Sequence, residues 1–135
     1  MLSREDALKT IEEAYAARMR GDKEGLARYW AEGARFRIAA DANYLPDLPL
    51  QAEHAMTAIS ELIDKFQFSD LQRLEAVVED NKVAVRWALN VSYEGSGPVR
   101  TELMDLIHLD DDGKIQSFVQ FADTAQIKGM AAAAG

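Results

Sequence analysis

The sequence predicts an α+β domain in which helices cover one face of a curved, mainly antiparallel sheet. In the first half of the chain, apolar residues recur at the spacing of amphipathic helices. In the second half the spacing changes to alternation, which is typical of strands with one buried face. Short turns rich in glycine, asparagine and aspartate separate the alternating segments, so we expect hairpins and antiparallel pairing.

Two helices are expected at the N-terminus. Ser3 and Asp6 form a start that resembles a capping box, and the first helix then runs to Gly21. Asp22 can cap a second, shorter helix that ends near Gly33. The buried stripe of the first helix is expected to contain Leu8, Ile11, Tyr15 and Met19.

A strand and a third helix follow. The segment ARFRIAAD, residues 34–41, alternates and predicts the first strand. Pro46 and Pro49 interrupt the chain in a loop, and a third helix is expected to begin near Leu50 or Gln51. Its predicted buried stripe is Met56, Ile59, Leu62, Ile63 and Phe66.

Four further strands complete the predicted fold. A chain of 135 residues is long enough for one core, so we expect a single domain over residues 1–128 and a flexible tail over residues 129–135. The strands are expected near residues 69–79, 82–94, 99–110 and 114–122, with turns at 80–81, 95–98 and 112–113.

Composition excludes several classes of function. The chain has no cysteine and only two histidines, and aspartates 110–112 lack the spacing of an EF-hand, so we expect no metal site. A net charge of −8 without a basic cluster indicates that nucleic acid is not a partner. No glycine-rich phosphate loop is present, so we expect no cofactor. Without an apolar segment of membrane-spanning or signal-peptide length, we expect a cytoplasmic protein with no membrane partner.

Asp105 is out of place in its predicted strand. Leu103 and Ile107 flank it on the apolar side, where an unpaired carboxylate is costly to bury. Two interpretations remain open: a structural carboxylate bonded to a tyrosine, an arginine or the backbone, or a pocket acid or base. No arginine shares its parity on this strand, so we expect burial to raise the Asp105 pKa.

The order of elements, together with GDKEGLARYWAEGARF and DDDGKIQSFVQFAD, resembles the nuclear transport factor 2-like superfamily. That superfamily includes SnoaL-like polyketide cyclases and ketosteroid isomerases. The resemblance implies a cone-shaped sheet, a cystatin-like α+β barrel, which wraps around the three helices and encloses an apolar pocket. It matches Asp105 to an oxyanion-hole aspartic acid and brings Tyr15 within about one residue of the oxyanion-hole tyrosine. The position of the isomerase general base falls on Ile38, and the nearest carboxylate is Asp41.

Strand parity then predicts the wall of this pocket. Gln120 either orients a ligand or lies at a polar rim, while Trp87 and Phe118 are ordinary core residues unless a cavity exists. His54, near the open end of the cone, is either a proton carrier or an exposed helix histidine. The expected ligand-binding residues are Trp87, Leu89, Val91, Leu103, Ile107, Phe118 and Gln120.

Two functions are compatible with these features. The first is a cofactor-independent isomerase, cyclase or dehydratase that acts by acid–base chemistry on a small apolar carbonyl compound, with Asp105, His54 and Tyr15 as catalytic candidates. The second is a non-catalytic domain for ligand binding or protein interaction, which the apolar Ile38 favours. We also expect a homodimer through the outer face of the sheet, where the last strand carries an apolar strip formed by Ser117, Val119 and Phe121.

Overall fold

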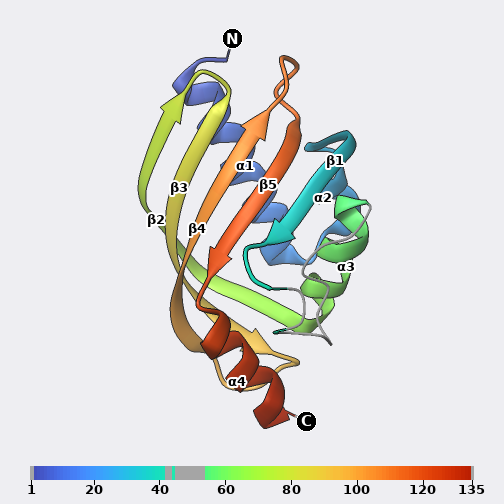
Figure 1. Cartoon of the computed structure of the whole chain (residues 1–135), viewed down its shortest axis with the longest axis vertical. Coiled ribbons are helices and arrows are strands. Elements are labelled where there is room, and N and C mark those ends of the chain that lie inside the picture. The colour runs from blue at the N-terminus through green and yellow to red at the C-terminus, as the bar shows by residue number, and fades with distance from the viewer. Residues whose placement is uncertain (1, 42–43, 45–53, 135) are drawn as a thin grey trace.

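The computed structural model describes residues 2–41, 44 and 54–134. These residues form a curved sheet with helices packed against it (Figure 1). The elements are, in chain order, α1 (Arg4–Arg20), α2 (Lys23–Ala27), β1 (Trp30–Ile38), α3 (Ala55–Lys65), β2 (Phe66–Glu79), β3 (Lys82–Tyr93), β4 (Val99–Leu109), β5 (Ile115–Ala122) and α4 (Thr124–Ala134).

The strands form one sheet in the order β1-β5-β4-β3-β2. The pairs from β2 to β5 are antiparallel, whereas β1 runs parallel to β5. Helix α3 contacts both edge strands, β1 and β2, so the sheet must curve until its two edges approach the same helix. The predicted α+β fold with a curved, mainly antiparallel sheet is therefore confirmed.

Helix α1 begins and ends where the sequence predicts. The Ser3 hydroxyl accepts a hydrogen bond from the Asp6 backbone N–H at 3.1 Å, and Gly21 ends the helix in the left-handed conformation with φ of 70°. The predicted buried stripe needs one correction. Met19 is 36% exposed, and Arg18 lies on the Tyr15 side of the helix in its place.

The start of β1 differs from the prediction. Helix α2 ends at Ala27, and Trp30, which we expected in that helix, is the first residue of the strand. Gly33, which we interpreted as a helix end, lies inside β1 with φ of 72°, where the pairing with β5 shifts register. A glycine in a β-bulge carries the same sequence signal as a glycine that ends a helix.

The junction between α3 and β2 also differs. Phe66, predicted in the helix stripe, begins β2, three residues before the expected strand. Asp70 has φ of 49° at a shift in the β2–β3 register, so the polar pair at Ser69 and Asp70 marks a bulge inside the strand. The predicted helix start near Leu50 lies outside the described residues.

The C-terminal segment is helical where we expected a flexible tail. Residues 124–134 form helix α4, whose alanine run has high helix propensity. The Asp123 carboxylate accepts a hydrogen bond from the Gln126 backbone N–H at 3.0 Å at the start of the helix. Ile127 and Met130 pack against the core, so the domain extends beyond residue 128.

One hydrophobic core fills the concave side of the sheet. Burial alternates along β3 and β4, and the inward residues from Val83 to Val91 and from Leu103 to Leu109 are buried. The buried faces of α1 and α3 belong to the same cluster. Among the described helices, none has both the length and the apolar character needed to cross a membrane.

Candidate functional site

Asp105 lies at the centre of a buried hydrogen-bond network. Its side chain is fully buried, and Gln120 is its direct partner in the β4–β5 register, so both side chains are on the concave face. The Tyr15 hydroxyl donates to Oδ2 of Asp105 from α1. Trp87 Nε1 donates to the same oxygen at 3.0 Å, and Gln120 Nε2 donates to Oδ1 at 3.2 Å. Both carboxyl oxygens are therefore satisfied by neutral donors.

Burial dominates the electrostatics of this network. It raises the pKa of Asp105 from 3.8 to about 7, although the hydrogen bonds from Tyr15, Gln120 and Trp87 oppose the rise. Burial and the adjacent carboxylate also raise the pKa of Tyr15 well above its usual value. Near neutral pH, Tyr15 is therefore a phenol, and Asp105 is close to the midpoint of its titration.

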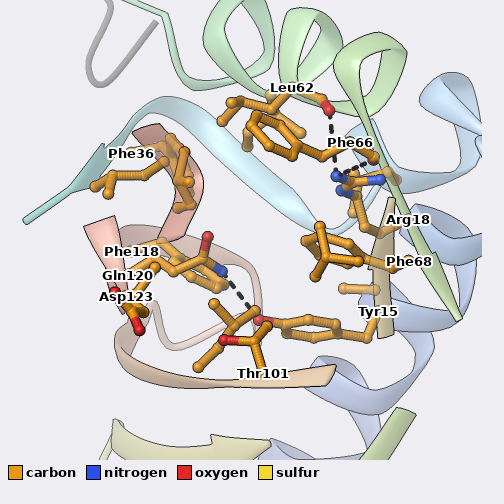
Figure 2. A pocket seen from close by; sticks show the side chains of 18 of the residues that line it. Tyr15, Arg18, Phe36, Leu62, Phe66, Phe68, Thr101, Phe118, Gln120 and Asp123 are labelled. Atoms are coloured by element: carbon orange, nitrogen blue, oxygen red, sulfur yellow. Dashed lines mark hydrogen bonds between the residues drawn. The ribbon is translucent and has the colours of Figure 1, made fainter. Parts of the chain in front are cut away.

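An apolar cavity of about 90 Å³ adjoins the network. One water molecule needs ~10–15 Å³ of such space, so the cavity is about six to nine times as large as a site for a single water. Tyr15 lines the cavity from α1 and Gln120 lines it from β5. Gln120 Nε2 also donates to the Tyr15 hydroxyl at 3.2 Å (Figure 2). The polar side chains on the wall, besides the indole of Trp30, are Tyr15, Arg18, Thr101, Gln120, Asp123 and Gln126.

The seven predicted ligand-binding residues all point inward, since each is at most 9% exposed. Val91, Leu103, Phe118 and Gln120 line the cavity. Trp87, Leu89 and Ile107 do not line it, which corrects their predicted place on the wall. The Tyr15 ring lies against the Trp87 indole, with 4.4 Å between ring centroids and the planes tilted by 38°.

The three predicted catalytic residues are placed differently from one another. Tyr15 lines the cavity, whereas Asp105 lies behind Tyr15 and Gln120 and does not reach the wall. His54 is exposed at the N-cap of α3, makes no capping hydrogen bond and is not part of the lining. The structure thus brings Tyr15 and Asp105 together but leaves His54 apart from them.

Sequence reasoning missed several residues of the wall. Arg18 is three residues after Tyr15 and seven after Ile11, so helical spacing could have placed it on the same face. Trp30 has no hydrogen-bond partner for its Nε1 atom among the described residues, and it stacks on Phe118 at 5.7 Å between ring centroids. Ile127 and Met130 of α4 close the cavity from a segment that we expected to be a tail.

Ile38, where the resemblance puts the isomerase general base, is buried and lines the cavity. Asp123 places a carboxylate on the cavity wall. It is an exposed residue, and its Oδ1 accepts a hydrogen bond at the start of α4. Within residues 2–41, 44 and 54–134, no group of three or more histidine, aspartate or glutamate side chains is arranged to hold a metal ion.

The fold and this site define a member of the nuclear transport factor 2-like class. Residues 11–118 match the family described as SnoaL-like domain, and the chain belongs to that family. No curated protein matches the chain significantly.

Solved structures of low sequence identity share the fold. A putative isomerase from Bacillus subtilis has a TM-score of 0.78 at 18% identity, with 98% of this chain and 96% of that chain covered. An NTF2-like protein of unknown function from Burkholderia pseudomallei has a TM-score of 0.77 at 16% identity, with 96% and 98% covered. An LEH-like epoxide hydrolase from M. tuberculosis has a TM-score of 0.71 at 12% identity, with 93% and 90% covered.

Proposed function

We propose that this protein is a cofactor-independent enzyme that acts by acid–base chemistry on a small, largely apolar carbonyl compound. The observation that carries the proposal is the hydrogen bond between Tyr15, on the cavity wall, and Asp105, whose pKa burial raises to about 7. An apolar cavity with few polar groups is the usual form of a small-molecule site. The names of two similar structures, an isomerase and an epoxide hydrolase, are compatible with this class.

The proposed step is stabilisation of negative charge on a carbonyl oxygen. When Asp105 is protonated, its O–H donates to the Tyr15 oxygen, and the Tyr15 O–H is free to donate to a ligand oxygen in the cavity. Gln120, bonded to both groups, holds this geometry. Such a preorganised donor in an apolar site lowers the barrier to enolisation, in which a solvent water takes the α-proton of the ligand and negative charge develops on the oxygen that accepts from Tyr15. When Asp105 is ionised, the Tyr15 proton is held by the carboxylate instead.

Exchange of α-protons tests this proposal. We expect the protein to accelerate hydrogen–deuterium exchange at the α-carbon of propiophenone in D2O, measured by proton NMR, and to do so faster at pH 6 than at pH 8. Tyr15→Phe should slow the exchange about 100-fold. The control is Tyr29→Phe, because Tyr29 donates to Glu13 at 3.2 Å outside the cavity. No acceleration for a ketone that binds the wild-type protein would contradict the proposed chemistry.

A second candidate function is non-catalytic binding of a small apolar molecule. Two observations favour it: Ile38 is apolar where the isomerase has its base, and Asp105 does not reach the cavity wall. Quenching of tryptophan fluorescence by propiophenone, without accelerated exchange, would support this alternative over catalysis.

We also propose a homodimer through the outer face of the sheet. Met104, Leu106 and Phe121 are exposed there by 39%, 40% and 49%. Met104 pairs with Phe121, and Leu106 pairs with Val119, so these side chains form one patch across β4 and β5. An apolar patch on a sheet face is a common site of self-association.

A further inference from the structure

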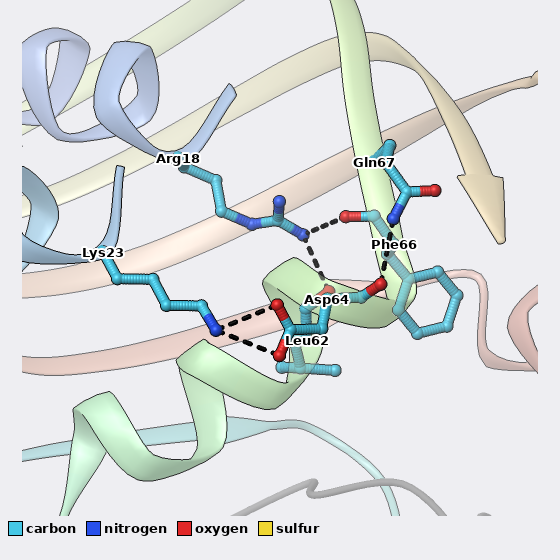
Figure 3. Close-up of polar contacts among 6 residues, drawn as sticks. All are labelled: Arg18, Lys23, Leu62, Asp64, Phe66 and Gln67. Carbon is cyan, nitrogen blue, oxygen red and sulfur yellow. Dashed lines mark hydrogen bonds and ion pairs between the residues drawn. The ribbon is translucent and has the colours of Figure 1, made fainter. Parts of the chain in front are cut away.

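Arg18 is a cation on the wall of an otherwise largely apolar cavity. It follows Tyr15 by one turn of α1, so both side chains face the same space (Figure 2). Its guanidinium packs on the ring of Phe68, with Cζ 3.8 Å from the ring centroid. Nη2 donates to the carbonyl oxygens of Leu62 and Phe66 at 3.3 and 2.7 Å (Figure 3).

These contacts leave the charge of Arg18 without a carboxylate. Among the residues that the structure describes, Arg18 has no ion pair, in contrast to Arg73 and Arg86, which pair with glutamates. The nearby carboxylate of Asp64 is instead bonded to Lys23, at 2.9 and 3.0 Å (Figure 3). Burial lowers the pKa of Arg18 to about 10, so the group remains a cation at neutral pH.

A purely structural role explains only part of this arrangement. The two carbonyls lie at the C-terminal end of α3, where a cation is favourable, and Arg18 ties α1 to the junction of α3 and β2. That role occupies Nη2 alone. Guanidinium carries five N–H groups, and within the described part of the chain no hydrogen bond is made by Nη1 or Nε of Arg18.

We propose that the cavity takes an organic acid, a small carbonyl compound whose carboxylate pairs with Arg18 while its carbonyl group faces Tyr15. This inference rests on the proposed function and adds the substrate class. The rest of the ligand would lie against the apolar wall between the two groups. The net charge of the chain is −8, so one unpaired arginine beside Tyr15 is a local exception that selects for an anion.

Two ligands of nearly the same shape test the inference. The probes are 4-oxo-4-phenylbutanoate, which carries a carboxylate, and 4-oxo-4-phenylbutanamide, in which a neutral amide replaces it. Binding is measured by calorimetry and by quenching of tryptophan fluorescence. We expect the wild-type protein to bind the acid about tenfold or more tightly than the amide, because a charge-assisted hydrogen bond is stronger than a neutral one. Equal affinities would overturn the inference.

Variants locate the preference. Arg18→Met keeps an unbranched apolar stem and should abolish the preference for the acid, whereas Arg18→Lys should retain a part of it. The matched control is Lys23→Met, which removes a cation that pairs with Asp64 outside the cavity and should keep the full preference. An Arg18→Met protein that still prefers the acid would overturn the inference. If Arg18→Met does not fold, the acid and the amide are compared on Arg18→Lys and Lys23→Met. A full preference for the acid in Arg18→Lys, together with a lost preference in Lys23→Met, would also overturn the inference.

The same probes separate this inference from the proposed function, because both contain α-protons. If the acid binds preferentially through Arg18 but its α-protons exchange no faster than in buffer, the inference stands and the proposed catalysis fails. If acid and amide bind and exchange equally, catalysis stands and the inference about the substrate class fails.

Discussion

At the scale of single residues, one carboxylate determines the chemistry of the concave face. Asp105 occupies a position in β4 where its flanking inward neighbours, Leu103 and Ile107, are apolar and buried. Arg86 and Arg100 are paired elsewhere, Arg86 with Glu75 and Glu102, and Arg100 with the backbone oxygen of Asp70. With only neutral donors around it, the energetic balance at Asp105 is set by desolvation, and its charge state is linked to the stability of the fold.

Asp105→Asn should therefore stabilise the protein at alkaline pH. A folded pKa of about 7, above the unfolded value near 3.9, means that the unfolded chain ionises first. The wild-type protein should lose stability progressively between about pH 4 and pH 7, by up to roughly 4 kcal/mol. Asparagine cannot ionise and removes this loss, and Gln120 can turn its amide to accept the new N–H. Urea melts at pH 4.5, 6 and 8 measure the effect.

The pH dependence distinguishes this result from a general change in charge. Asp64→Asn removes a negative charge from an exposed ion pair with Lys23 and serves as the reference variant. Relative to that reference, Asp105→Asn should gain stability as the pH rises. A difference between Asp105→Asn and the wild-type protein that stays constant from pH 4.5 to pH 8 would contradict the raised pKa.

The sequence was informative about these residues where only strand parity was needed. Asp105 and Gln120 were predicted on the concave face because alternation along a strand is independent of the rest of the fold. The position of Tyr15 between Asp105 and the cavity could not be predicted, since it depends on how α1 packs across the sheet. The choice of Met19 over Arg18 is an error of one residue, about 100° around a helix.

At the scale of elements, strands β3, β4 and β5 and helix α1 are held together by the network as well as by the core. Trp87 contributes a buried indole, a ring contact with Tyr15 and a hydrogen bond to Asp105. Gln120 contributes hydrogen bonds to Asp105 and Tyr15 but a much smaller apolar surface.

Trp87→Ala should consequently destabilise the fold more than Gln120→Ala. Truncation of a large buried aromatic residue costs about 3–5 kcal/mol, through lost transfer free energy and a new cavity. Loss of Gln120 should cost about 1–3 kcal/mol, because it removes donors to two buried oxygen atoms. Urea melts of both variants at pH 6 give the comparison. Equal losses would mean that the indole packs less well than its 2% exposure indicates.

Elements were predictable where local signals agree with the tertiary structure. The cap at Ser3, the turn at Gly113 and the alternation in β3 and β4 are local, and they predict α1 and the meander within a few residues. The bulge at Gly33 and the helix after Asp123 were missed. The bulge depends on a long-range interaction, the parallel pairing of β1 with β5. The helix has local signals, the Asp123 cap and the alanine run, which we interpreted as a tail.

The outer face of the sheet matters at the scale of the whole molecule. Registered pairs place Val77, Ala84, Leu106 and Val119 in one apolar row across β2, β3, β4 and β5. The row ends at Arg37 of β1, beside Arg35, and both arginines are exposed. Glu75 and Glu102 lie towards the opposite side of the same face, around Arg86. The same apolar row of a second copy can cover this exposed row across a two-fold axis.

We therefore expect a homodimer that Leu106→Lys dissociates. Sedimentation equilibrium at 10 µM should give twice the 15.0 kDa mass of one chain for the wild-type protein. A lysine in the centre of the patch would bury an unpaired charge at the interface, so this variant should sediment as a monomer. Because Leu106 points away from the cavity, the variant should still bind 4-oxo-4-phenylbutanoate.

The control is Ala16→Lys, which adds the same charge to the exposed side of α1 and should leave the dimer intact. A wild-type protein that sediments at 15.0 kDa at this concentration would exclude the dimer, and a dimer that survives Leu106→Lys would place the interface on another surface.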